Sequence, residues 1–69
     1  MRGVVRWFDV RRGYGFIIPD EGDPDVFLHR RIVRAAGLRR LEPGQVVEYE
    51  AQETPQGRKA TRIVLVIPS

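Results

Sequence analysis

The sequence predicts an all-β fold: a small five-stranded antiparallel barrel with one short helical turn after the third strand. Five short segments rich in β-branched and aromatic residues alternate with turns rich in Gly, Pro and Asp. Only residues 30–36 have a helical pattern, which is too short for more than one or two turns. The chain has 69 residues and no cysteine, so closing a sheet into a barrel is one way to stabilise a small core without disulfides.

The first three expected strands are residues 4–8, 14–18 and 25–29. A charged turn that ends in Gly13 separates the first two strands. Pro19 ends the second strand because proline has no N–H to donate to a sheet. Turn-forming residues then lead into the third strand.

The helical segment at residues 30–36 follows the third strand directly. Gly37 comes next and suits the position just after a helix. Residues 38–41 have no clear assignment, and residues 42–44 form a turn around Pro43 and Gly44.

Two further strands complete the expected sheet. Residues 46–51 alternate, which predicts a fourth strand with Val47 and Tyr49 inward and Glu48 and Glu50 outward. Residues 52–58 are expected to be a polar loop, and residues 59–67, rich in β-branched side chains, a fifth strand.

We expect residues 1–69 to form one domain that acts as a monomer in the cytoplasm. The sequence shows no repeat, linker or low-complexity segment. Charged residues interrupt the N-terminus before an apolar run reaches signal-peptide length, and no window is long enough to span a membrane. The missing cysteines are in keeping with a reducing compartment.

The protein is basic, with a formal net charge of +3 and a pI near 10.2. Every basic residue except Lys59 is arginine, whose planar guanidinium binds phosphate bidentately and stacks on rings. This balance favours a polyanionic partner. The alternative is that the arginines only solvate the surface.

Aromatic side chains occupy the expected outer face of the second and third strands. Strand alternation turns Ile17, Val26 and Leu28 inward. The same alternation turns a ring-bearing set outward, where polar residues are normal: Tyr14, Phe16, Phe27 and His29. Exposed rings beside arginines suit single-stranded nucleic acid, since bases stack on rings and phosphates attract cations. The competing interpretation is that the rings belong to the core.

Trp7 and Phe8 are further candidates from the first strand, and Trp7 is preferred. Strict alternation cannot place both rings on one flat face. A bulge or a curved strand relaxes that limit.

The sequence does not predict an enzyme, a metal site or a cofactor. His29 is the only histidine, without cysteines or a nearby serine to form a metal site or a catalytic triad. It is expected to stack on or hydrogen-bond to a base, or to be an ordinary surface residue. The acidic residues Asp20, Glu21, Asp23 and Asp25 lack the spacing of a calcium loop and predict a solvated turn, with Asp25 fixing local hydrogen bonds.

Three motifs together resemble the bacterial cold-shock domain family: Trp7-Phe8-Asp9, the stretch Arg12-Gly13-Tyr14-Gly15-Phe16-Ile17, and Asp25-Val26-Phe27-Leu28-His29. Residues 41–47 are also similar to that family's turn into its fourth strand. The resemblance implies an OB-fold barrel that binds single-stranded RNA and single-stranded DNA. It also implies a role as RNA chaperone, antiterminator or translational regulator, often under cold or other stress.

The resemblance also implies a set of binding residues: Arg6, Trp7, Asp9, Arg12, Tyr14, Phe16, Phe27 and His29, with Arg58 from the last loop. Three positions depart from the family pattern. Asp9 stands where asparagine is common, Arg30 where an aromatic follows the histidine, and Leu38 where another aromatic is usual. Arg30 and the arginines that follow it are expected to replace stacking by phosphate attraction.

Two rival functions stay open at this point. One is an OB-type module that docks on structured RNA or the ribosome through the arginine-rich residues 30–40. The other is a protein-interaction barrel whose aromatic groove takes a proline-rich peptide.

Overall fold

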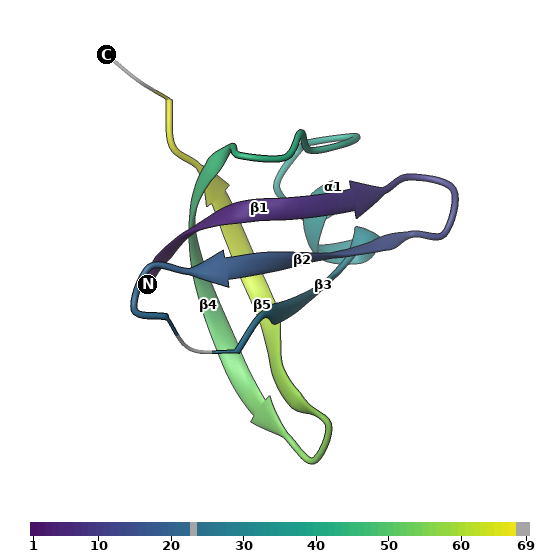
Figure 1. Ribbon diagram of the computed structural model, residues 1–69. Coiled ribbons are helices and arrows are strands. Elements are labelled where there is room, and N and C mark those ends of the chain that lie inside the picture. The colour runs from purple at the N-terminus through teal and green to yellow at the C-terminus, as the bar shows by residue number, and fades with distance from the viewer. Residues whose placement is uncertain (23, 68–69) are drawn as a thin grey trace.

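Five strands close into a barrel in the order β1-β2-β3-β5-β4, as the computed structural model shows for residues 1–22 and 24–67 (Figure 1). The elements are β1 (Arg2–Asp9), β2 (Tyr14–Pro19), β3 (Val26–His29), α1 (Arg30–Ala35), β4 (Val46–Thr54) and β5 (Gly57–Leu65). The predicted all-β, five-stranded OB-type barrel with one short helix is therefore confirmed. Asp23 lies outside the described residues. No helix in the described ranges is long and apolar enough to cross a membrane.

One pairing in the barrel is parallel. β1 pairs antiparallel with β2 and with β4, and the β2–β3 and β4–β5 pairs are antiparallel too. β3 meets β5 in parallel, with Phe27 opposite Lys59. An odd number of strands cannot alternate in direction all the way round a closed ring. The predicted antiparallel pairing is therefore correct for the other four strand pairs and wrong for the β3–β5 pair that closes the barrel.

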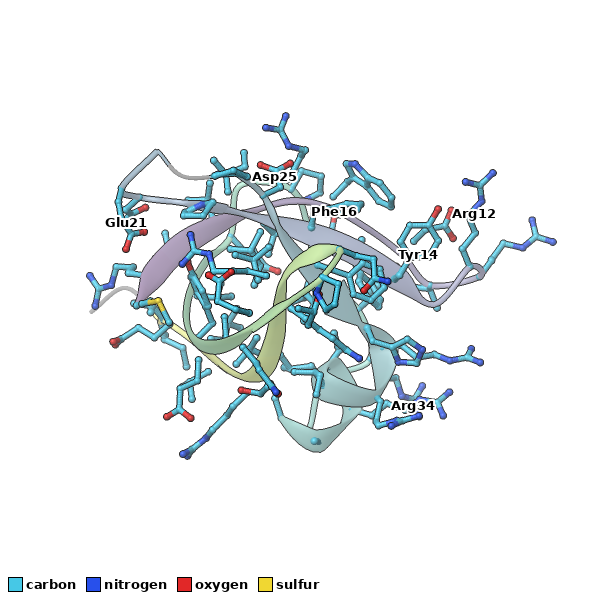
Figure 2. The ribbon with its side chains drawn as sticks, turned by 90° about the horizontal axis from the view of Figure 1, so that it is seen from below. Arg12, Tyr14, Phe16, Glu21, Asp25 and Arg34 are labelled. Atoms are coloured by element: carbon cyan, nitrogen blue, oxygen red, sulfur yellow. The ribbon has the colours of Figure 1, made fainter. Side chains whose placement is uncertain are left out.

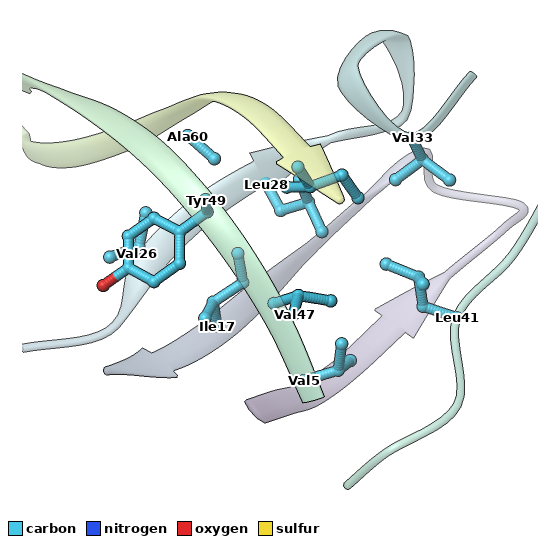
Figure 3. Close-up of a cluster of buried hydrophobic side chains, with 10 residues drawn as sticks. Val5, Ile17, Val26, Leu28, Val33, Leu41, Val47, Tyr49 and Ala60 are labelled. Carbon is cyan, nitrogen blue, oxygen red and sulfur yellow. The ribbon is translucent and has the colours of Figure 1, made fainter. Parts of the chain in front are cut away.

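The core fills the barrel with side chains from all five strands and from α1 (Figure 3). Its members are Val5, Ile17, Val26, Leu28, Val33, Leu41, Val47, Tyr49, Ala60 and Ile63. Ile17, Val26 and Leu28 are fully buried, as alternation predicts, and Val47 and Tyr49 are also inside. The unassigned residues 38–41 contribute Leu41 to this core and place Leu38 against it.

The predicted loop at residues 52–58 is wrong, because β4 and β5 continue through most of it. Only Pro55 and Gln56 separate the two strands. The Thr54 hydroxyl donates to the carbonyl of Gly57 over 2.6 Å and accepts from the N–H of Gln56 over 3.2 Å. Gly57 has a φ of 125°, a value that side-chain-bearing residues rarely adopt. The end of the hairpin extends past the barrel (Figure 1). Because it does not pack on the core, its residues show no alternation of apolar and polar side chains that would predict a strand.

β1 contains a bulge between Val5 and Trp7, and the bulge reverses the sides of the residues after it. Val5 pairs with Ile17, whereas Trp7 pairs with Phe16, so Arg6 is the extra residue. Val5 is buried, Phe8 packs against the core, and Trp7 is half-exposed on the outside. The expected preference for Trp7 over Phe8 on the outer face thus has a structural cause.

Gly15 allows β1 and β2 to approach closely beside this bulge. A Cβ at Gly15 would clash with the carbonyl oxygen of Trp7 and lie 2.7 Å from the Cα of Phe8. Real Cβ atoms essentially never come that close to backbone. Gly15 is therefore needed on the inner side of the sheet, beneath Phe8.

We expect Gly15→Ala to lower the free energy of unfolding by about 1–3 kcal/mol, because the added methyl overpacks the contact between β1 and β2. Denaturant unfolding monitored by circular dichroism measures the change. Val10→Ala, at an exposed turn position, is the control and should alter stability by less than about 0.5 kcal/mol. Equal stabilities of the two variants would show that the close approach is not required.

Candidate nucleic-acid interface

Four rings from three strands form a continuous outer surface, called here the aromatic face: Trp7, Tyr14, Phe16 and Phe27. The strand register brings them together, since Phe16 pairs with both Trp7 on β1 and Phe27 on β3. All four side chains are partly exposed. The outward orientation predicted for the rings of β2 and β3 is therefore what the structure contains.

The rings of the aromatic face hold one another in place. The Trp7 centroid lies 5.4 Å from that of Phe16 and 5.5 Å from that of Tyr14, both edge-to-face. Phe27 lies 5.8 Å from Phe16, and it stacks on Tyr14 at 5.9 Å with an interplanar angle of 23°. Such pairs favour a fixed geometry. A ligand that stacks here would meet a surface that is already ordered.

His29 borders the aromatic face, opposite Tyr14 in the β2–β3 register. Its Nδ1 accepts the backbone N–H of Arg31 over 3.0 Å and so caps α1. Nε2 is the remaining ring nitrogen, on a half-exposed side chain. Within residues 1–22 and 24–67, no group of three His, Cys, Asp or Glu side chains could hold a metal ion.

Arg6, the extra residue of the bulge, forms an ion pair with Asp25. Its Nε lies 2.6 Å from Oδ2 of Asp25, and a second nitrogen lies 3.3 Å from Oδ1. Asp25, expected to fix local hydrogen bonds, therefore ties the start of β3 to β1. The Arg6 guanidinium is therefore paired with a carboxylate, whereas the Arg12 guanidinium forms no ion pair with any carboxylate among residues 1–22 and 24–67.

Asp9 organises the turn between β1 and β2. Its Oδ1 accepts the backbone N–H groups of Arg11 over 2.9 Å and of Arg12 over 3.0 Å. The hydrogen bond from the Arg12 backbone is the main cause that lowers the pKa of the Asp9 carboxyl. The side chain of Arg12 donates to the Tyr14 hydroxyl over 3.4 Å, and this bond raises the Arg12 pKa. Asp9 therefore acts through the backbone of the turn.

A groove of about 400 Å³ separates the aromatic face from the β4–β5 hairpin. Phe16 and Phe27 line one side, and the hairpin supplies the other from Thr54, Gln56, Gly57, Arg58 and Lys59. Arg58, expected in a loop, lies on β5 beside the rings, with its side chain only 17% exposed and its Nε 3.9 Å from a carboxylate oxygen of Glu53.

Sequence reasoning missed Thr54 and Gln56 as residues of this groove, because it treated residues 52–58 as a loop, and it placed Lys59 in the fifth strand without assigning it to the site. Lys59 is exposed and pairs with Phe27, whereas its neighbour Ala60 is buried. Because neighbouring residues of a strand point to opposite faces, a buried Ala60 implies that Lys59 lies on the outer side. No local sequence pattern predicts the contact between β3 and β5.

Leu38 and Arg30, which stand where the family usually has aromatic residues, have different surroundings. Leu38 packs against the core beside Ile32 of α1. Arg30 lies over the β1–β2 turn: its N–H donates to the carbonyl of Gly13 over 2.9 Å. Its side-chain Cδ and Nε would be 3.2 Å from a Cβ at that glycine. Arg30 therefore extends the surface beyond Tyr14, and Leu38 supports the fold.

Comparison with known proteins identifies the family. The family model described as the 'Cold-shock' DNA-binding domain matches residues 1–66. The cold shock-like protein of Thermotoga maritima is 48% identical over 66 residues, which cover 96% of this chain and 98% of that protein. The probable cold shock protein A of Mycolicibacterium smegmatis is 42% identical over 62 residues, covering 90% of this chain and 92% of the relative. The major cold shock protein of Micrococcus luteus is 38% identical over 61 residues, or 88% and 91%. This chain therefore belongs to the cold-shock domain family, which is a family of nucleic-acid-binding proteins.

Proposed function

We propose that this protein binds single-stranded RNA and single-stranded DNA on its aromatic face, as a monomeric single domain in the cytoplasm, and that it catalyses no reaction. The observation that carries the proposal is the set of four mutually packed, partly exposed rings on a sheet surface where polar side chains are normal. Membership of a nucleic-acid-binding family agrees with it.

Unpaired bases fit this surface better than a duplex does. Each unpaired base has two open faces that can stack on a ring, at about 1–3 kcal/mol per base. In a double helix those faces are covered by neighbouring base pairs. The stacking free energy of three or four bases would exceed the free-energy cost of ordering a short strand.

Cations beside the rings supply the attraction for phosphate. Arg12 donates to the hydroxyl of Tyr14, and Arg58 and Lys59 border the groove next to Phe16 and Phe27. The net charge of +3 adds a general attraction for polyanions. A proline-rich peptide would gain nothing from these cations, which favours nucleic acid over a peptide ligand.

The cellular role in this proposal is that of an RNA chaperone, antiterminator or translational regulator, as the resemblance to cold-shock proteins implies. Each of these roles requires a protein that holds RNA strands apart and releases them. An open aromatic face that stacks bases suits such work. Docking on structured RNA is the alternative, and comparing a hairpin with an unpaired strand of equal length distinguishes the two.

Removing one ring tests the proposal. We expect Phe27→Ala to weaken the binding of a short oligothymidine by about 1–3 kcal/mol, because one stacking surface is lost. Phe27→Leu keeps apolar volume without a π-face and should lose most of the same amount. Quenching of Trp7 fluorescence by the oligonucleotide measures the affinity.

Val64→Ala, at a position on β5 that is 51% exposed, is the matched control and should bind like the parent protein. Thermal unfolding of each variant separates lost binding from lost folding. Unchanged affinity in Phe27→Ala and in Phe16→Ala would return both rings to a purely structural role.

Binding should also weaken as salt rises, because cations lie beside the rings of the aromatic face. Contacts from Arg12, Arg58 and Lys59 to single-strand phosphates predict a slope of log K against log salt of about −2, at about −0.7 per phosphate. Titrations of an oligopyrimidine and an oligopurine at several salt concentrations measure the slope and the base preference. A nearly flat slope, with strong base preference, would contradict this balance.

Asp9→Asn should strengthen oligonucleotide binding about two- to five-fold at low salt, as expected for removing one exposed charge. The amide oxygen can still accept the N–H groups of Arg11 and Arg12, so the turn is retained. Because the pKa of Asp9 is lowered, its carboxylate is ionised throughout the neutral range. Its stabilisation of the turn is present above the ordinary carboxyl pKa and is lost as the pH falls through the lowered value.

Anisotropy of a labelled oligothymidine measures this affinity, and thermal unfolding between pH 6 and pH 2 measures the turn. Asp9→Ala, which removes the acceptor, is the control and should unfold at a lower temperature at neutral pH. Weaker binding by Asp9→Asn would mean that the carboxylate itself takes part in ligand contact.

A further inference from the structure

Five arginines cluster beyond the Tyr14 end of the aromatic face, on the β1–β2 turn and on α1. They are called here the arginine end: Arg11, Arg12, Arg30, Arg31 and Arg34. The two segments touch, since the Arg30 N–H donates to the carbonyl of Gly13 and the Arg30 side chain lies over that glycine. All five side chains are exposed. Figure 2 shows Arg12 and Arg34 extending from the same side of the molecule.

None of these five guanidinium groups forms an ion pair with a carboxylate in the described part of the chain. The arginines that do so lie elsewhere: Arg2 with Glu48, Arg6 with Asp25, Arg40 with Glu42 and Arg58 with Glu53. Asp9 is close by, but its hydrogen bonds go to backbone N–H groups. Asp9 attracts Arg11 and Arg12 electrostatically, but one carboxylate beside five guanidinium groups leaves the arginine end with a net positive charge.

This charge also opposes local stability. Arg30 and Arg31 occupy the first turn of α1, which has no acidic residue there. The start of a helix favours negative side chains, and like charges four residues apart, such as Arg30 and Arg34, repel. Arg34 is in the last turn, where a cation is favourable, so the unfavourable helix-end charges are those of Arg30 and Arg31. These arginines are better explained by an anionic ligand.

The opposite end of the aromatic face is acidic. Following β2 away from Tyr14 leads to Asp20 and Glu21, whereas the charge of Asp25, just before β3, is neutralised by its ion pair with Arg6. In Figure 2, Glu21, Asp25, Phe16, Tyr14 and Arg12 follow one another across the molecule in that order. A polyanion that lies on the rings would be repelled at one end and attracted at the other.

We propose that the arginine end extends the binding surface past Arg12 as a phosphate-binding site, which holds the sugar-phosphate backbone of a nucleic acid beyond the bases that stack on the aromatic face. This inference rests on the proposed function, because the same strand occupies both surfaces. The segments at residues 10–13 and 30–41 contain no aromatic residue. The arginine end therefore binds backbone without stacking bases on rings.

Oligonucleotides with abasic extensions test this site. The probes are hexathymidine alone and hexathymidine with four abasic sugar-phosphate units at either the 5′ or the 3′ end. Trp7 fluorescence reports the binding of the thymidine segment in every case. We expect one of the two extensions to raise affinity at least about fivefold at low salt, and to steepen the salt slope by about 0.7 per phosphate bound. The other extension, directed toward the acidic end, gives no gain.

A double variant assigns the gain to the arginine end. Arg31→Gln with Arg34→Gln should reduce the gain to less than about twofold, with hexathymidine still bound and with thermal stability little changed, because Arg31 opposes the helix dipole and Arg34 favours it. Arg2→Gln with Arg62→Gln removes the same charge from β1 and β5 and should keep the gain. A hairpin stem in place of the favourable abasic extension tells whether paired backbone is accepted as well.

The outcomes separate the two proposals. Equal gains from both extensions, or no gain from either while hexathymidine binds, would overturn the phosphate site and leave the proposed function intact. A gain that survives in Arg31→Gln with Arg34→Gln would overturn its location. Failure of hexathymidine to bind at all would overturn the proposed function, and the phosphate site with it.

Discussion

The candidate site depends on one extra residue in β1. The bulge between Val5 and Trp7 leaves Val5 in the core, turns Trp7 outward and returns Phe8 to the core. Without it, strict alternation would bury Trp7 and expose Phe8. Gly15 makes this arrangement possible, because a side chain there would collide with the backbone of β1. The core and the aromatic face are therefore set by the same alternation, which turns Trp7 and Phe16 outward and Val5 and Ile17 inward.

Charged side chains, like the rings, are unevenly distributed over the barrel. Asp9 fixes the β1–β2 turn through backbone hydrogen bonds, which leaves the side chains of Arg11 and Arg12 at the surface. Asp25, at the other end, binds Arg6. The rings lie between a region whose arginines lack carboxylate partners among the described residues and a region that begins with acidic turn residues. Stacking and phosphate attraction are therefore assigned to neighbouring but different surfaces of the same fold.

Local patterns were sufficient to predict much of this molecule. Alternation in β2 and β3 placed Ile17 inside and Phe16 outside, and short strands between turns predicted the closed barrel. Features set by distant contacts were missed. The parallel closure of β3 on β5 follows from ring parity, which no segment reveals, and it positions Lys59 beside Phe27. The extended β4–β5 hairpin was misassigned because both of its faces are polar. The backbone hydrogen bonds of Asp9 likewise depend on turn geometry that residue type alone does not determine.

The central claim is that bases stack directly on rings whose positions the bulge determines. Proton nuclear magnetic resonance of hexathymidine, free and bound, tests it most directly. Stacking predicts upfield ring-current shifts of the thymine H6 and methyl protons, with nuclear Overhauser contacts from these protons to the rings of Trp7, Phe16 and Phe27. Binding that shifts only the arginine signals, and leaves the thymine protons unshifted and without contacts to these rings, would contradict the account.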